Sequence, residues 1–229
     1  MLMLPGNKSS ARAFSDRLDV DKLGGRNKQA KAIMKKMKAN GLEPVFYNAP
    51  YPWVEPGEWV SQDGRGGVLI DQPDEPRQWW PEGLSIEQVP DVSNVPIPSN
   101  IPITTERTLS DLEAFIREEG ITAILAHSQG GHVAGLLMLQ LEQGGNNPIE
   151  RVVLMSTYNS HSEEDTLETP ALIYHCENDE VVPIACHPTT DLWTNGVYYL
   201  RETGRHHISG RTGDWSKFCE FLGSEMRCL

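Results

Sequence analysis

The junction between residues 121–126 and the segment after them restricts the fold most. Residues 121–126 form a nearly continuous apolar run, which is typical of a parallel strand covered on both faces. Apolar side chains then recur at helical spacing over residues 129–142. Ser128 stands between these segments, and the residues two places before and after it are Ala126 and Gly130. A strand-to-helix turn sharp enough to expose a serine needs small residues at both places. The junction therefore predicts a nucleophile elbow at Ser128.

The rest of the chain alternates between the same two kinds of pattern. Residues 1–4 are a short apolar run that ends at Pro5 and Gly6, which together favour a turn. Further strands are predicted at residues 44–48, 151–155, 171–175 and 197–200, and further helices at residues 27–40, 105–119 and 214–222. Such alternation predicts a mostly parallel sheet with helices on both faces. Together with the elbow, it predicts an α/β-hydrolase fold of about six strands, as one domain over residues 1–229.

The segment at about residues 50–104 differs in composition from the rest. It contains ten of the sixteen prolines and four of the six tryptophans. Proline lacks the N–H that central strands and helix interiors need, whereas several tryptophans favour a packed segment over a disordered one. We therefore expect a cap or lid inserted into the domain. Its aromatic side chains would form apolar walls for a substrate, with Trp79 and Trp80 as candidate substrate-binding residues.

A serine becomes a useful nucleophile only when a base removes its proton, so a histidine oriented by a carboxylate is expected. In this fold the acid and the histidine follow the serine in that order along the chain. Asp179 stands in an acidic turn directly after one predicted strand, and the pair His206 and His207 follows the next strand. We favour His206 over His207 as the base. Ser128, Asp179 and His206 are therefore the candidate catalytic residues.

Acyl transfer also needs backbone N–H groups that bind the oxyanion of the tetrahedral intermediate. One donor is expected from Gln129, the residue directly after the nucleophile. The second is expected from the loop after the first strand, where Gly6 lets the backbone approach closely and Asn7 is the best candidate. With the Ser, His and Asp side chains, these donors complete the chemistry, so no metal and no cofactor is expected.

The charge, the apolar runs and the cysteines argue against nucleic-acid binding, a membrane span, secretion and a disulfide framework. The formal net charge is −12, whereas binding of nucleic acid or of an anionic membrane surface requires a basic face. No stretch approaches the roughly eighteen consecutive apolar residues of a membrane span, and Pro5 interrupts the first apolar run too early for a secretory signal. Four scattered cysteines do not form a disulfide framework. We therefore expect free thiols and a cytoplasmic location.

Several motifs together resemble the FSH family, the serine hydrolases of the α/β-hydrolase superfamily that include yeast serine hydrolases and fungal polyketide-releasing thioesterases. The motifs are Leu4-Pro5-Gly6-Asn7 followed by Phe14, Asn48-Ala49-Pro50, Arg77-Gln78-Trp79-Trp80, Ala126-His127-Ser128-Gln129-Gly130, Asn178-Asp179 followed by Val182-Pro183, and Gly204-Arg205-His206. The last of these supports His206 as the base independently. The sequence departs from the family pattern at Pro5, where a histidine is usual, and at His127, where an aromatic or apolar residue is usual.

These observations predict a serine hydrolase that cleaves carboxylic esters or thioesters of small to medium acyl groups through an acyl-serine intermediate. The partner is then a small-molecule substrate, and the choice between ester and thioester stays open. Two other functions are compatible with the same fold. One is a peptidase or amidase that uses the same three side chains, and the other is a non-catalytic protein that binds a ligand in the same pocket.

Overall fold

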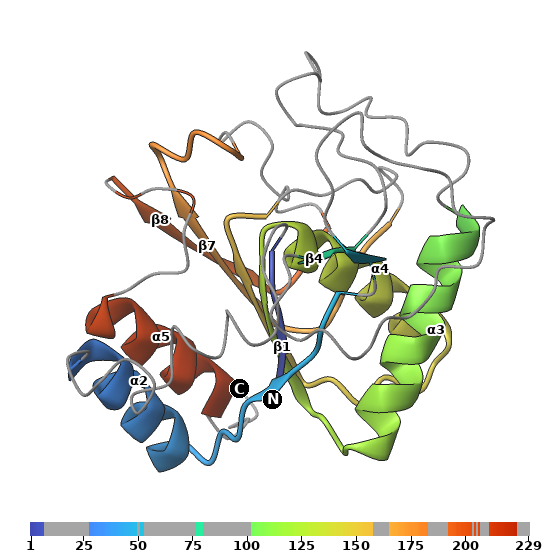
Figure 1. Ribbon diagram of the computed structural model, residues 1–229, viewed down its shortest axis with the longest axis horizontal. Helices are drawn as coiled ribbons and strands as arrows, with labels where there is room; N and C mark the ends of the chain where they lie inside the picture. The colour runs from blue at the N-terminus through green and yellow to red at the C-terminus, as the bar shows by residue number, and fades with distance from the viewer. Residues whose placement is uncertain are drawn as a thin grey trace.

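A six-stranded parallel sheet forms the centre of the protein, with helices on both of its faces (Figure 1). The computed structural model describes residues 1–6, 28–49, 51–52, 77–79, 102–157, 165–182, 192–202, 204, 206 and 211–223. The strands are β1 (Leu2–Leu4), β2 (Val45–Phe46), β5 (Ala123–His127), β6 (Arg151–Met155), β7 (Ala171–Cys176) and β8 (Gly196–Arg201). Every neighbouring pair in this sheet is parallel. The predicted α/β fold of about six strands is therefore confirmed.

The order of the strands is β2-β1-β5-β6-β7-β8. From β1 the chain runs outward to β2, then returns to the other side of β1 to form β5, and continues outward through β6, β7 and β8. The direction of winding therefore reverses between β1 and β5. In open parallel sheets, ligands bind beyond the carboxyl ends of the strands at such a reversal. The turn that holds Ser128 follows β5 and lies at this position.

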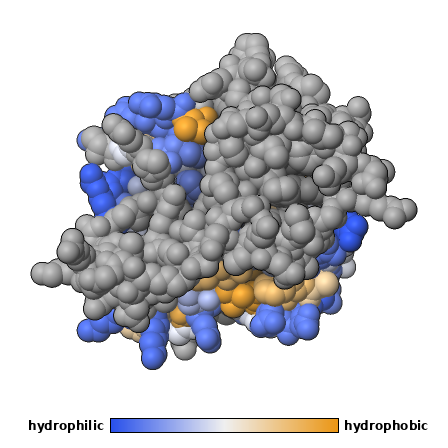
Figure 2. Space-filling view, in the orientation of Figure 1, coloured by the Kyte–Doolittle hydropathy of each residue, from blue (hydrophilic) through white to orange (hydrophobic). Residues whose placement is uncertain are grey.

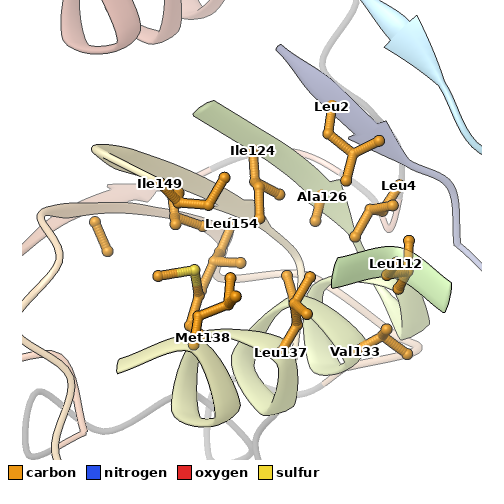
Figure 3. Packing of buried hydrophobic residues seen from close by; sticks show 14 of the residues in the cluster. Leu2, Leu4, Leu112, Ile124, Ala126, Val133, Leu137, Met138, Ile149 and Leu154 are labelled. Carbon is orange, nitrogen blue, oxygen red and sulfur yellow. The ribbon is translucent and has the colours of Figure 1, made fainter. Parts of the chain in front are cut away.

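The two faces of the sheet are covered by different helices. Helices α3 (Pro102–Glu118) and α4 (Gln129–Gln143) cover one face, and α2 (Lys28–Ala39) and α5 (Thr212–Gly223) cover the other. Successive residues of β5 alternate between them, because Ile124 and Ala126 pack with α4 whereas Ala123 and Leu125 pack on the opposite side. Each face of the sheet thus has its own hydrophobic core. Figure 3 shows the core on the side of α3 and α4, where leucine, isoleucine and valine side chains from β1, β5 and α4 interdigitate.

The boundaries of the elements follow the predictions within a few residues. The largest shift is at α3, which begins at Pro102 although the sequence predicts residue 105. Proline fits the first turn of a helix because the N–H that it lacks has no partner there. Two short strands, β3 (Tyr51–Pro52) and β4 (Arg77–Gln78), pair in an antiparallel ribbon where no strand was predicted.

The predicted cap at about residues 50–104 is described only at residues 51–52, 77–79 and 102–104, so the rest of it lies outside the described residues. The space-filling view shows hydrophilic residues along the margins of the described surface, with a band of hydrophobic residues between them (Figure 2). Among the helices within the described ranges, none is long and apolar enough to cross a bilayer.

Candidate active site

Ser128 forms the sharp turn between β5 and α4. Its backbone has φ 52° and ψ −124°, a conformation that side-chain-bearing residues rarely adopt and that costs on the order of 1–3 kcal/mol. The Ser128 N–H donates to the carbonyl of Met155 at 2.9 Å, which ties the turn to the end of β6. A Cβ atom added at Gly130 would collide with the carbonyl oxygens of Pro5 and Leu4. The helix therefore starts against the end of β1, where only a small residue fits.

The imidazole of His206 lies between the Ser128 hydroxyl and the Asp179 carboxylate. His206 Nε2 is 2.8 Å from Ser128 Oγ, and His206 Nδ1 is 2.9 Å from Asp179 Oδ2 and 3.0 Å from Oδ1. When Nδ1–H donates to the carboxylate, Nε2 presents its lone pair to the serine hydroxyl. The structure thus brings together three side chains that follow three different strands, β5, β7 and β8. His207 lies outside the described residues.

Asp179 is held by the turn that follows β7. The N–H groups of Val181 and Val182 donate to Asp179 Oδ1 at 3.0 and 2.8 Å. Burial alone would raise the pKa of this carboxyl, but the hydrogen bonds from His206 and Val182 outweigh it and lower the pKa of Asp179 to about 2. Asp179 is therefore ionised at neutral pH, and its carboxylate accepts a hydrogen bond from Nδ1–H of the histidine.

A second histidine, in β7, supports this turn through a hydrogen bond to its backbone. His175, the fifth residue of β7, is buried, and its Nε2–H donates to the carbonyl of Val182 at 2.9 Å. Burial lowers the pKa of His175, which favours the neutral ring. A neutral donor at this place fixes the Val182 peptide without adding a second positive charge beside His206.

The end of β1 lies directly over the elbow. An added Cβ at Gly6 would be 2.8 Å from Nδ1 of His127 and 3.0 Å from Cβ of Ser128. Gln129 is the first residue of α4, and the first N–H groups of a helix have no acceptor within the helix. Its N–H is therefore available next to Ser128. Asn7, the other predicted oxyanion donor, lies outside the described residues.

Of the two candidate substrate-binding tryptophans, Trp80 lies outside the described residues and Trp79 is only 2% exposed. Both N–H groups of Trp79 are used inside the protein. The backbone N–H donates to Oε1 of Gln129 at 2.9 Å, and the indole Nε1–H donates to the carbonyl of Pro5 at 2.8 Å. The Trp79 ring therefore has little free surface for a substrate, in contrast to the wall expected from the sequence.

Of two further neighbours of Ser128, sequence reasoning missed Thr157 and named His127 only as a departure from the family pattern. Thr157 donates from Oγ1 to the carbonyl of Ser128 at 3.0 Å, and a side chain at Gly131 would collide with this hydroxyl. His127 is 7% exposed, and its ring centroid lies 5.0 Å from that of His206 at an interplanar angle of 42°. The second of the paired glycines, Gly131, is the one sequence signal of the Thr157 contact.

The groups gathered at this site are of the types that acid–base and nucleophilic chemistry needs. In the part of the chain that the structure describes, no group of three or more His, Cys, Asp or Glu side chains is arranged to hold a metal ion. Cys176 and Cys219 are free and buried. Burial raises the pKa of both thiols, that of Cys219 to about 11, and a thiol in this state is a poor nucleophile.

A parallel sheet that reverses its winding beside β5, with a serine on a strained turn into the next helix, defines an α/β-hydrolase fold. Residues 1–209 match the protein family described as "Serine hydrolase (FSH1)". The chain belongs to this family of hydrolases, as the resemblance of its motifs predicted. No curated protein sequence matches it.

Solved structures share the fold at low sequence identity. A variant of SOBER1 from Arabidopsis thaliana has a TM-score of 0.58 and 15% identity over 96% of each chain. The Bacillus cereus carboxylesterase has a TM-score of 0.58 and 12% identity, over 96% of this chain and 85% of the other. The RedJ thioesterase from the prodiginine biosynthetic pathway of Streptomyces coelicolor has a TM-score of 0.52 and 12% identity, over 96% and 84%. At these identities, the likeness extends to the fold alone.

Proposed function

We propose that this hydrolase cleaves carboxylic esters or thioesters of small to medium acyl groups through an acyl-serine intermediate, with Ser128 as nucleophile, His206 as base and Asp179 as the acid that orients the base. The observation that carries the proposal is the position of the His206 imidazole, 2.8 Å from Ser128 Oγ on one side and 2.9 Å from Asp179 Oδ2 on the other. Both are hydrogen-bond distances, and the distance between His206 Nε2 and Ser128 Oγ is within the reach required for proton transfer.

In the first step, His206 Nε2 takes the proton of the Ser128 hydroxyl while Oγ forms a bond to the acyl carbon. The carbonyl oxygen of the substrate becomes an oxyanion. When this intermediate collapses, the bond to the leaving alcohol or thiol breaks and His206 returns its proton to that group. Water then attacks the acyl-serine, again with His206 as the base, and releases the carboxylic acid. The balance requires one water for each ester cleaved.

Asp179 serves this cycle as a permanent anion. The imidazole of His206 and the backbone N–H of Val182 lower its pKa to about 2, so the carboxylate does not take up the proton in transit. It stabilises the imidazolium that forms in each step and keeps Nδ1 protonated. The oxyanion is proposed to be bound by the backbone N–H groups of Gln129 and Asn7, each of which is worth about 10²–10³-fold in rate.

The acyl group is the open part of the proposal. The structural neighbours named above include a carboxylesterase and a thioesterase, so esters and thioesters of matched acyl chains are the first substrates to compare. Trp80 remains a proposed wall of the acyl site. Location in the cytoplasm, a single domain with a cap at about residues 50–104, and independence from metals and cofactors are parts of the same proposal.

The decisive experiment compares the wild-type protein with Ser128→Ala. Wild-type protein is expected to react with a fluorophosphonate probe and to hydrolyse p-nitrophenyl esters or acyl thioesters. Ser128→Ala should abolish labelling and lower turnover on the order of 10⁴–10⁶-fold. Ser110→Ala is the matched control, because Ser110 is exposed on α3 and its hydroxyl bonds to the carbonyl of Glu106 in the same helix. Both activities should be unchanged in that control.

The outcomes separate the three functions. Full turnover by Ser128→Ala would contradict the proposed nucleophile. Faster cleavage of matched amides than of esters would instead favour a peptidase or amidase. Absence of labelling and of turnover in folded wild-type protein would favour a non-catalytic binding protein.

A further inference from the structure

Trp79 connects the two sides of the proposed oxyanion site. It follows β4, which pairs with β3 in the short ribbon of Tyr51 with Gln78 and Pro52 with Arg77. From there the indole Nε1–H donates to the carbonyl of Pro5, 74 positions earlier in the chain, and the backbone N–H donates to the side chain of Gln129, 50 positions later. Pro5 directly precedes the loop of one proposed donor, and Gln129 carries the other.

The bond to Pro5 fixes the direction of a peptide group. The carbonyl of Pro5 and the N–H of Gly6 belong to the same planar unit and point in opposite directions. A donor that holds the carbonyl therefore also fixes the direction of the N–H of Gly6. This peptide lies over the elbow, because a Cβ at Gly6 would be 3.0 Å from Cβ of Ser128. A small rotation of this peptide would therefore move its N–H relative to the Ser128 side chain.

The indole ring is itself fixed by aromatic packing. It stacks on the ring of Tyr47, with centroids 6.3 Å apart and an interplanar angle of 9°. Tyr47 in turn meets the edge of Phe115 at 5.1 Å, so the stack joins the end of β2 to α3. Trp79 is 2% exposed, and a ring packed in this way has one available position for its N–H. The donor is thus rigid in both place and direction.

From these contacts we propose that Trp79 is a positioning residue for the oxyanion site, which holds the Pro5–Gly6 peptide over Ser128 through its indole N–H and the start of α4 through its backbone N–H. This inference rests on the proposed function. Its physical basis is the buried carbonyl of Pro5. Without the indole donor, that carbonyl would lose the hydrogen bond that Trp79 makes to it, and a buried carbonyl without a partner is unfavourable. The peptide would turn toward another donor and displace the N–H groups that follow it.

The test is Trp79→Phe, which retains an aromatic ring over Tyr47 but removes the indole N–H. The expected result is a fall in kcat of about 10- to 100-fold, short of the full loss of an oxyanion donor, with KM changed less than about twofold because ground-state binding does not use the oxyanion. Affinity for a trifluoromethyl ketone, which forms a tetrahedral adduct with the serine, should fall by the same factor as kcat/KM.

Trp193→Phe is the matched control. Trp193 is equally buried, at 1% exposed, but within the described residues its indole N–H bonds to no acceptor. It precedes β8 and therefore lies at the amino end of that strand, whereas the site lies at the carboxyl ends of the strands. The control should lose a similar packing energy and retain its kcat. Should Trp79→Phe fail to fold, Gln129→Met removes the other bond of Trp79 and is expected to lower kcat several-fold at unchanged KM.

The inference is overturned if Trp79→Phe and Gln129→Met keep the wild-type kcat, or if Trp193→Phe loses as much kcat as Trp79→Phe. A rise in KM alone would also overturn it, because that result would make Trp79 a wall for the substrate. These results differ from failure of the proposed function itself. In that case the wild-type protein would neither turn over an ester nor react with the fluorophosphonate probe.

Discussion

Replacement of Asp179 by asparagine should reduce both turnover and the pH dependence of stability. The pKa of this carboxyl is lowered from 3.8 to about 2 in the folded protein, and each pH unit of such a difference corresponds to about 1.36 kcal/mol. The ionised carboxylate thus contributes about 2 kcal/mol to the free energy of unfolding at pH 7. Asparagine keeps the size of the side chain but cannot carry this charge.

The sign of the pH effect follows from the lowered pKa. Above about pH 4 the carboxyl is ionised in both the folded and the unfolded states, and the full contribution is present. As the pH falls from 4 toward 2, the unfolded chain takes up the proton first, so stability is lost. About half of the contribution should be gone by pH 3. The stability difference between the wild-type protein and Asp179→Asn should therefore shrink over this range.

Equilibrium unfolding in urea at pH 7, 5, 4 and 3 measures this difference. Glu180→Gln is the matched control, because Glu180 is an exposed acid in the same turn. Its effect should stay below about 0.5 kcal/mol at every pH. Turnover by Asp179→Asn should fall by about 10⁴-fold, as expected when the histidine loses the anion that fixes its tautomer. Parallel stability curves for the wild-type protein and Asp179→Asn from pH 7 to pH 3 would refute the reasoning.

Three further predictions concern the elbow and the buried thiols. Ser128→Gly should be more stable than Ser128→Ala by about 1 kcal/mol in urea unfolding, because glycine relieves the strain at φ 52°; equal stability would mean that the turn is unstrained. Gly130→Ala should lose activity and about 1–3 kcal/mol of stability, because its Cβ meets the carbonyl of Pro5; a wild-type unfolding curve would contradict that clash. Cys219, whose pKa is raised to about 11 by burial, should escape alkylation by iodoacetamide at pH 8 in peptide mapping until the protein is unfolded; rapid labelling of folded protein would show that the thiol is accessible.

The sheet and the elbow could be predicted from the sequence because their signals are local. Residues 151–155 are predicted as a strand from five consecutive letters, and β6 has those bounds. Ser128 is identified by the small residues Ala126 and Gly130 at fixed spacing around it, although the atoms that exclude a side chain at Gly130 are the carbonyl oxygens of Leu4 and Pro5, far away in the chain. The positions of Asp179 and His206 follow from chain order, since parallel strands deliver their carboxyl ends to one edge of the sheet.

The contacts that hold the site could not be predicted in the same way. Trp79 appears in the sequence as one of several aromatic residues in a proline-rich segment, and a substrate wall is the natural interpretation of that composition. Its two hydrogen bonds join residues 74 and 50 positions apart, and no local pattern encodes such a pairing. The bond from Thr157 to the Ser128 carbonyl likewise spans 29 positions. The only trace of this contact in the sequence is that residue 131 is glycine, because a side chain there would collide with Thr157.

This division between local and distant signals bears on how activity can be inferred within the family. The chemistry at Ser128, His206 and Asp179 needs a few residue types in a fixed order, and a sequence that retains them would still be inactive if its oxyanion donors pointed elsewhere. Those donors are backbone groups, which every residue type except proline supplies, and on the inference above their direction depends on contacts such as that of Trp79 with Pro5. In the proposed mechanism, retention of the three side chains is therefore a necessary condition for turnover, whereas the distant contacts decide whether the tetrahedral intermediate is stabilised.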